Sequence, residues 1–543
     1  MANATAVGSD VTSKELFGHP RQLWMLFMTE FWERFSFYGM RWALTLYIVA
    51  QFFAGDQSGQ AFASRTYGAF LALVYATSIF GGYAADRLIG YQRSILLGAV
   101  ITAAGLFMIV VPNQEIFLMG LAVVITGNGL FKPNISTMVG QLYKPDDARR
   151  DSGFTIFYMG INAGALVAPL LTGVLAGMRV VSADTHTCAS LLADNHTGFC
   201  QAIGSSLIYT TSLVGEQNYK AVFIATGVGM IVSFLWFWFG RRQLGEIGRP
   251  PQGAGMGKML VVLIGALVCA PLVYLLLNLG GGTYGSIPAL AFTEVVGGPL
   301  QALLGTMFIL LLAFLIIEGV REGNVQRDKV FAMIALFIFN IFFWCFFEQA
   351  GSSFNFLAEN IVNRNLWGFD FPIGWFQSIN PIGIVVLAPL ITIVWGMLNA
   401  MKAEPSIPRK FGLGLIFNGL SFVVLMYALS SLVQNGHIPF WPLATTYLIQ
   451  TVGELCLSPI GLSMVTKLAP LNSVGFAMGG WFLSVSVGNN LSGIVAAGMS
   501  GETGMTTASA LQGYTTSFYI LGGAGMLLFL IAPLITRLMH GVK

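Results

Sequence analysis

Apolar segments of about 20 residues recur along the whole of this 543-residue chain, and each is long enough to cross a bilayer as a helix. Only 9% of the residues are charged, against roughly 25% in a soluble domain. A single soluble core is not built from so many separate segments of this length. The sequence therefore predicts an all-α polytopic membrane protein.

Fourteen such segments are expected to span the membrane. They run approximately Trp24–Gln51, Thr66–Arg87, Ser94–Val111, Glu115–Gln141, Ser152–Met178, Tyr219–Gly240, Met259–Leu279, Leu300–Glu318, Val330–Asn355, Ile373–Asn399, Phe411–Leu432, Phe440–Lys467, Ser473–Met499 and Thr515–Met539. Because the number is even, both termini are expected on the same side of the membrane.

Lysine and arginine are concentrated in the loops on the side of the N-terminus, for example at Arg87, Arg93 and Arg149. Cytoplasmic loops carry such an excess, so both termini are predicted to be cytoplasmic and the protein to lie in the cell membrane. Cys188 and Cys200 share one outer loop, and an oxidising compartment would allow them to form a disulfide. The net charge of +3 does not suggest a nucleic-acid surface.

The first span carries four charged residues, Glu30, Glu33, Arg34 and Arg41. A charge at the bilayer centre costs about 2.5–3.5 kcal/mol, whereas each leucine or isoleucine returns only about 0.3–0.6 kcal/mol. At about 100° per residue, these charges and Tyr38 fall within a sector of roughly 140° on one helix. The first span therefore needs polar partners, which we expect on other spans.

Three further charges lie inside apolar segments: Lys132 beside Pro133 in the fourth span, Glu348 in the ninth and Glu454 in the twelfth. Lys132 is too far from both ends of its span to reach the membrane surface easily. A lysine that faces a cavity is favoured over one held in a structural ion pair. Four carboxylates then accompany three cations inside the membrane. Since arginine stays charged, the odd carboxylate takes up a proton or waits for a cationic substrate group, as proton coupling would require.

Other polar residues in the spans are weaker indications on their own. Tyr158 and Asn162 lie one turn apart in the fifth span, but small residues and amides also serve helix packing. The tenth span begins with a segment that contains two amides and a proline, Gln377–Pro381. The loop 81–93 combines glycines with Asp86 and neighbouring arginines, and it resembles the loop signature of the major facilitator superfamily.

Together these residues resemble the proton-dependent oligopeptide transporter (POT) family, which lies within that superfamily. The ExxERFxYYG motif is present at Glu30–Gly39, with Phe37 in place of its first tyrosine. The FYxxINxG stretch Phe157–Gly164, the segment Gln377–Pro381 and the GExxxSPxGLSxxxKLAP segment Gly453–Pro470 follow in the same order.

The resemblance implies the major facilitator fold, with two six-helix bundles and two extra helices between them. The expected boundaries are 1–240 for the N-terminal bundle, 241–328 for a linker with the two additional helices, and 329–543 for the C-terminal bundle. The resemblance also implies import of di- and tripeptides with protons by alternating access. No cofactor, metal or enzymatic activity is expected.

Carried over residue by residue, the resemblance implies a role for each polar position. Glu30, Glu33 and Arg34 would act in proton coupling, and Arg41 with Glu348 would form an extracellular gate. The peptide-binding residues would be Arg34 and Lys132 for the carboxylate, Glu454, Asn162 and Asn380 for the amine, and Tyr38, Tyr75, Tyr158 and Trp481 for the side chains.

The chemistry of a peptide agrees with these assignments. A peptide is a zwitterion, so a site that binds only its ends needs a cation and an anion some distance apart. Lys132 and Glu454 lie in opposite halves of the chain. Because one residue spans at most about 3.6 Å, a fixed distance between these charges would exclude long peptides. It would leave the identity of the side chains loosely specified.

Three other functions compete with this interpretation. A facilitator of another small solute, such as nitrate, an amino acid, a sugar or a drug, would share many of the motifs, although Lys132 and Glu454 together favour peptides. An intramembrane enzyme is disfavoured because all five histidines lie in predicted loops or tails, away from embedded carboxylates and cysteines. A structural or receptor role would not explain seven charges in apolar helices.

Overall fold

The computed structural model describes residues 15–144, 147, 149–177, 217–251, 255–280, 298–470 and 473–542. Cys188 and Cys200 lie outside these residues, so their pairing stays a prediction. Fourteen helices of 18 residues or more occur in the described ranges, which is the expected number of spans. Thirteen of them are apolar enough to cross a membrane. The other is α1 (Arg21–Phe52), whose charged and polar side chains lower its mean hydropathy.

The chain divides into two compact units. The first unit consists of Met1–Arg41 and Thr77–Tyr274, and the second consists of Trp42–Ala76 and Leu275–Lys543. The helices α1 and α2 are therefore each shared between the two units. The three-part division at residues 240 and 328 stays a prediction.

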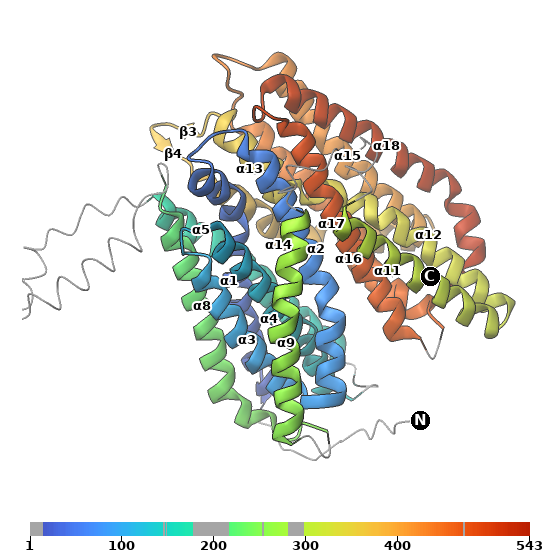
Figure 1. Ribbon diagram of the computed structural model, residues 1–543. Helices are drawn as coiled ribbons and strands as arrows, with labels where there is room; N and C mark the ends of the chain where they lie inside the picture. The colour runs from blue at the N-terminus through green and yellow to red at the C-terminus, as the bar shows by residue number, and fades with distance from the viewer. Residues whose placement is uncertain are drawn as a thin grey trace, which may run out of the picture. The chain divides into compact units, whose positions relative to one another are not determined.

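The first unit begins with a short hairpin and contains most of the helices of the N-terminal half (Figure 1). Its elements are β1 (Glu15–Leu16), β2 (His19–Pro20), the first part of α1, the second part of α2 (Gly59–Ala84), a π-helical turn (Ala85–Ile89), α3 (Tyr91–Met108), α4 (Gln114–Gln141), α5 (Arg150–Gly177), α8 (Tyr219–Gly240), a 3-10 turn (Arg241–Leu244) and most of α9 (Met256–Gly280).

The second unit holds the remaining helices, among which α15 and α18 lie side by side (Figure 1). Its elements after α9 are α11 (Pro299–Arg321), α12 (Asn324–Phe347), a 3-10 turn (Glu348–Gly351), α13 (Ser353–Asn360), β3 (Asn365–Leu366), β4 (Phe369–Asp370), α14 (Trp375–Ala400), α15 (Ile407–Ser431), α16 (Trp441–Leu468), α17 (Val474–Ser500) and α18 (Thr507–Leu538).

The two extra helices, α9 and α11, pack at the edges of different units. Val262 and Ala266 of α9 join a buried cluster with Ile89 and Leu130 of the first unit. Helix α11 packs against α12 and α17 of the second unit. Many of their other apolar side chains are exposed, as at Leu267 of α9, which fits helices that face lipid.

The ninth predicted span is broken where the sequence suggested one continuous helix. Helix α12 ends at Phe347, a 3-10 turn begins at Glu348, and α13 follows. Side-chain amides bond to carbonyls around the break: Gln349 donates to the carbonyl of Cys345 at 3.2 Å, and Asn355 donates to that of Gly351 at 3.1 Å. These bonds replace part of the backbone hydrogen bonding that the interrupted helix loses.

Gly81 lies where α2 packs closely against α4. A Cβ atom at Gly81 would lie 1.8 Å from the carbonyl oxygen of Gly129 on α4. The obstacle is backbone, so the two helices would have to separate to admit it. We therefore expect Gly81→Ala to destabilise the protein by about 1–3 kcal/mol, seen as a lower midpoint of thermal unfolding in detergent.

Gly82 provides the matched control for this prediction, because a Cβ there meets no atom within 4 Å. Gly82→Ala should leave the midpoint unchanged or raise it slightly, since alanine stabilises a helix relative to glycine. Equal midpoints for the two variants would contradict the close contact between α2 and α4.

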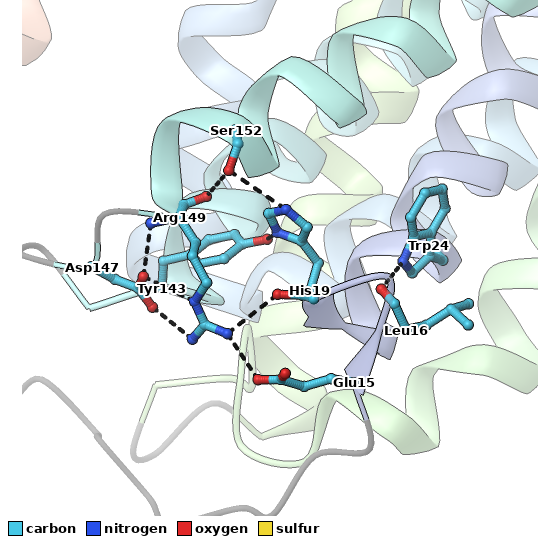
Figure 2. Close-up of polar contacts among 9 residues, drawn as sticks. Glu15, Leu16, His19, Trp24, Tyr143, Asp147, Arg149 and Ser152 are labelled. Atoms are coloured by element: carbon cyan, nitrogen blue, oxygen red, sulfur yellow. Dashed lines mark hydrogen bonds and ion pairs between the residues drawn. The ribbon is translucent and has the colours of Figure 1, made fainter.

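The β1–β2 hairpin fastens the start of α1 to the turn between α4 and α5 (Figure 2). The His19 ring lies 2.8 Å from the hydroxyl of Tyr143 through Nδ1 and 3.5 Å from that of Ser152 through Nε2. Arg149 donates to the Glu15 carboxylate at 2.8 Å and also binds Asp147. The hairpin thereby restrains the end of the helix that carries the ExxERF residues.

Two ionisable groups of this turn respond to its hydrogen bonds and burial. Hydrogen bonds from the side chain and backbone of Arg149 hold the pKa of Asp147 below its usual value. Burial raises the pKa of Tyr143 to about 12. At neutral pH Asp147 is therefore ionised and Tyr143 is protonated, which are the forms that these contacts require.

Candidate functional site

The charges of α1 form a compact buried cluster in the first unit. The guanidinium Nε of Arg34 lies 3.1 Å from Glu30 Oε1, one helical turn earlier. Its Nη2 donates to Glu33 Oε1 at 2.7 Å, and its Nε contacts the other oxygen of Glu33. All three side chains are at most 4% exposed. Arg34 is therefore shared between two carboxylates. Buried carboxylates need such a cationic partner, because an unpaired buried charge is costly.

Helix α4 contributes an amide and a cation to this cluster. The side-chain amide of Asn128 donates to Glu33 Oε1 at 2.8 Å. Lys132, one turn further on, lies inside α4 as expected and interacts electrostatically with Glu30. No role was predicted for Asn128 from the sequence. Its position one turn before Lys132 puts the two on one face of α4, and that spacing could have identified it.

Helix α5 packs closely against α1 beside Arg34. A Cβ at Gly164 would lie 2.5 Å from the carbonyl oxygen of Phe31 and 2.8 Å from Cβ of Arg34. The amide of Asn162 donates to the carbonyl of Tyr158 within α5, at 3.0 Å. Tyr158 is 43% exposed. Gly164 of the FYxxINxG stretch thus has a packing role, whereas the peptide contacts of Tyr158 and Asn162 stay predictions.

Two aromatic rings of the first motif lie against the guanidinium groups of Arg34 and Arg41. The centre of the Phe37 ring lies 5.1 Å from the guanidinium carbon of Arg34. The centre of the Tyr38 ring lies 5.6 Å from that of Arg41. Both distances allow cation–π attraction, which partly compensates for the burial of the two guanidinium groups.

The second unit contains a separate, partly buried polar group on α14 and α16. The amide of Asn380 donates to Glu454 Oε2 at 2.8 Å and to the hydroxyl of Thr451 at 3.0 Å. Thr451 in turn donates to the carbonyl of Tyr447. The predicted pair of Asn380 and Glu454 is thus in direct contact. Thr451, which the sequence analysis missed, lies one turn from Glu454 on the same helix.

The other predicted residues of the second unit lie in different surroundings. Trp481 is 3% exposed and packs against Phe337 and Phe411, so its contacts are those of a core residue. Tyr75 stacks on Phe482 of α17. Their roles in side-chain pockets stay predictions.

The two predicted gate residues are both buried. Glu348 is 3% exposed, and its carboxylate lies 3.5 Å from the hydroxyl of Tyr67. Arg41 is 8% exposed and belongs to the first unit, whereas Glu348 belongs to the second. The pairing of Arg41 with Glu348 therefore stays a prediction.

A model of the POT family matches residues 92–511 of the chain. A peptide transporter of Yersinia enterocolitica subsp. palearctica is 35% identical over 554 residues, which cover 98% of this chain and 97% of that protein. A di-/tripeptide transporter of Lactococcus lactis subsp. cremoris is 34% identical, and the match covers 88% of each chain.

Solved structures agree with the sequence comparison. A peptide transporter POT in complex with sulfate has a TM-score of 0.75 and 32% identity, with 97% of this chain and 98% of that one covered. A POT family transporter in complex with 5-aminolevulinic acid has a TM-score of 0.74 and 28% identity, with 96% and 98% covered. The fold is therefore that of the major facilitator superfamily, and the chain belongs to the POT family.

Proposed function

We propose that this protein imports di- and tripeptides together with protons across the cell membrane by alternating access. Its membership of the POT family supports this function, as do the names of its relatives from Yersinia and Lactococcus. The structural observation that carries the proposal is the contact of Glu454 with Asn380, which fixes a carboxylate inside an apolar helix.

Glu454 is the proposed partner of the peptide amine. Its carboxylate accepts from the amide of Asn380, a neutral donor that orients the oxygens without cancelling their charge. The ammonium group of a peptide is the cation that we propose binds this carboxylate. Asn162, which belongs to the first unit, is likewise proposed as a partner of the amine.

Arg34 and Lys132 are the proposed partners of the peptide carboxylate. The Arg34 guanidinium is held by Glu30 and Glu33, so its N–H groups are engaged with protein carboxylates. Protonation of Glu33 would weaken that hold and allow Arg34 to turn toward a substrate carboxylate. Proton binding and peptide binding would then favour each other, which is the linkage that a symporter needs.

A second class of substrate has support from one neighbour. The POT family transporter solved with 5-aminolevulinic acid binds a molecule that carries an amine and a carboxylate on a short chain. A site that binds only the amine and the carboxylate of its substrate would accept such a molecule as well as a dipeptide. We propose small amino acids of this length as weaker substrates of the same site.

The proposed orientation of the protein in the membrane is based on the distribution of its charges. The excess of lysine and arginine on the side of the termini supports an inner-membrane protein with both termini in the cytoplasm. In that orientation the membrane potential contributes about 2.3 kcal/mol per imported charge for each 100 mV.

The test is uptake of labelled dialanine into liposomes that contain the purified protein, with an inside-negative potential and an inward proton gradient. We expect accumulation that a protonophore collapses. Unlabelled di- and tripeptides should inhibit it, whereas free alanine, tetra-alanine and N-acetylated dialanine should not.

Each competitor tests one part of the proposal. Strong inhibition by N-acetylated dialanine would contradict an amine site at Glu454, and strong inhibition by tetra-alanine would contradict the length limit. If dialanine is neither bound nor taken up, a different solute, such as nitrate, a sugar or a drug, becomes the better candidate.

A further inference from the structure

A small cavity adjoins Glu33 on a face of α1 that differs from the Arg34 face. Its walls come from α1, α3 and α4 of the first unit, and its lining residues are Glu33, Ser36, Phe37, Met40, Thr102, Leu106, Val124 and Asn128. On α1 these positions are spaced three and four residues apart. They therefore form one face, turned by about 100° from the face of Glu30, Arg34 and Tyr38.

The cavity has the size of a site for one water molecule. A water centre can occupy about 10 Å³ within it, which is close to what one ordered water needs. Every lining residue is buried, with at most 7% of its surface exposed. Four of the eight lining residues have polar side chains. An apolar cavity of this size would stay dry, whereas a polar one can hold water.

Two buried polar atoms at this cavity lack a hydrogen-bond partner within the protein. They are Oδ1 of Asn128 and Oγ1 of Thr102. The orientation of the Asn128 amide is fixed, because its Nδ2 must face the Glu33 carboxylate, which only accepts hydrogen bonds when ionised. Its Oδ1 therefore points away from Glu33. A buried amide oxygen and a buried hydroxyl without partners are costly, and water is the usual remedy.

We propose that this cavity binds an internal water molecule that positions Asn128 against Glu33. The water would accept from the hydroxyl of Thr102 and donate to Oδ1 of Asn128. It would also donate to Oγ of Ser36, whose own hydrogen is used toward the carbonyl of Trp32. That makes three hydrogen bonds, the usual number for a buried water.

The water acts on Glu33 through the Asn128 amide. A hydrogen bond to Oδ1 polarises the amide and makes Nδ2 a stronger donor to the carboxylate. The charged groups near this carboxylate are Arg34 and Glu30 on α1, and Lys132 of α4 interacts electrostatically with Glu30. The cavity linings from α3, Thr102 and Leu106, carry no charge. The water would thus stabilise ionised Glu33 through the Asn128 amide, in addition to the stabilisation by the charged groups.

The effect on transport rests on the proposed coupling role of Glu33, whereas the water site rests on the cavity alone. Thr102→Val keeps the shape of the side chain and removes the hydroxyl. Without its bound water, ionised Glu33 is less well stabilised and takes up a proton more easily. We expect a five- to tenfold loss of proton-driven dialanine uptake, roughly the effect of one weakened hydrogen bond, and a half-maximal pH shifted upward.

Two variants serve as controls. Thr102→Ser keeps the hydroxyl and should keep both the uptake and its pH profile close to wild type. Thr126→Val removes a buried threonine hydroxyl on α4 that already donates to the carbonyl of Ala122 at 2.9 Å and does not line the cavity. It should leave the pH profile unchanged, which separates loss of the water from a general loss of stability.

The decisive measurement is a structure of the wild-type protein at a resolution that reveals ordered water, together with the pH profiles. Density within hydrogen-bond distance of Asn128 Oδ1 and Thr102 Oγ1, lost in Thr102→Val, is the expected result. A dry cavity in the wild type would overturn the site, and an unshifted profile in Thr102→Val would overturn its effect on Glu33. Failure of the peptide-symport proposal would appear instead as no proton-driven uptake by the wild type.

Discussion

Replacing Lys132 with alanine is expected to reduce gradient-driven peptide uptake by at least about thirtyfold. The lysine lies inside α4 and interacts electrostatically with Glu30, next to the Arg34 cluster. If its ammonium binds the peptide carboxylate, the variant leaves that carboxylate without a partner in a poorly hydrated site, which costs about 2–5 kcal/mol. The measurement is initial uptake of labelled dialanine into liposomes at equal protein content.

Lys258→Ala is the matched control for Lys132→Ala. Lys258 lies in the first turn of α9, which packs at the edge of the first unit, and it is outside the proposed site. Its removal should leave uptake close to wild type. Near wild-type uptake by Lys132→Ala itself would remove Lys132 from the mechanism, provided that the variant unfolds at a normal temperature.

Glu33→Gln is expected to abolish proton-driven accumulation while peptide counterflow persists. The glutamine keeps the size of the side chain and cannot take up a proton. It also cannot hold the Arg34 guanidinium with two charged oxygens, as Glu33 does. Counterflow exchanges peptide for peptide and needs no net movement of protons. The two assays therefore separate coupling from binding, and equal losses in both would argue against a coupling role for Glu33.

Glu318→Gln controls for the loss of a paired carboxylate in general. Glu318 lies on the peripheral helix α11 and pairs with Arg321, three residues later, at 2.6 Å. Because this pair is on a solvent- or lipid-facing helix, its loss should change neither uptake nor counterflow. A comparable defect in Glu318→Gln would mean that the assay responds to stability rather than to proton coupling.

The spans, and the grouping of the charged residues on one side of α1, could be predicted from the sequence because both depend on local patterns. Hydrophobic segments of bilayer length are unambiguous when they recur along the whole chain, and the one-turn spacing of Glu30 and Arg34 places them together on any helix. The contact of Asn380 with Glu454 came from the family resemblance, since no local pattern joins two residues on different helices.

Other features depend on tertiary contacts that no local pattern reveals. Asn128 was missed because an amide between two glycines is also typical of helices that pack closely in membranes. Its contact with Glu33 joins two helices, so no local pattern indicates it. The break after Phe347 was missed because that segment has the composition of a continuous helix. Its 3-10 turn is instead supported by amides such as Gln349, which donates to the carbonyl of Ser492 on α17. The β1–β2 hairpin, whose His19 is hydrogen-bonded to Tyr143, has strands too short to show an alternation of polar and apolar residues.

The division of α1 and α2 between the two units has a mechanical consequence. Neither helix contains a proline, yet each belongs to one unit up to a single peptide bond and to the other unit beyond it. If each unit moved as a rigid body, a displacement of one against the other would bend both helices near Arg41 and near Ala76. Without a proline hinge, that bending is spread over the backbone hydrogen bonds of several turns. The helices would then act as elastic elements, and their stiffness would enter the rate of each transport cycle.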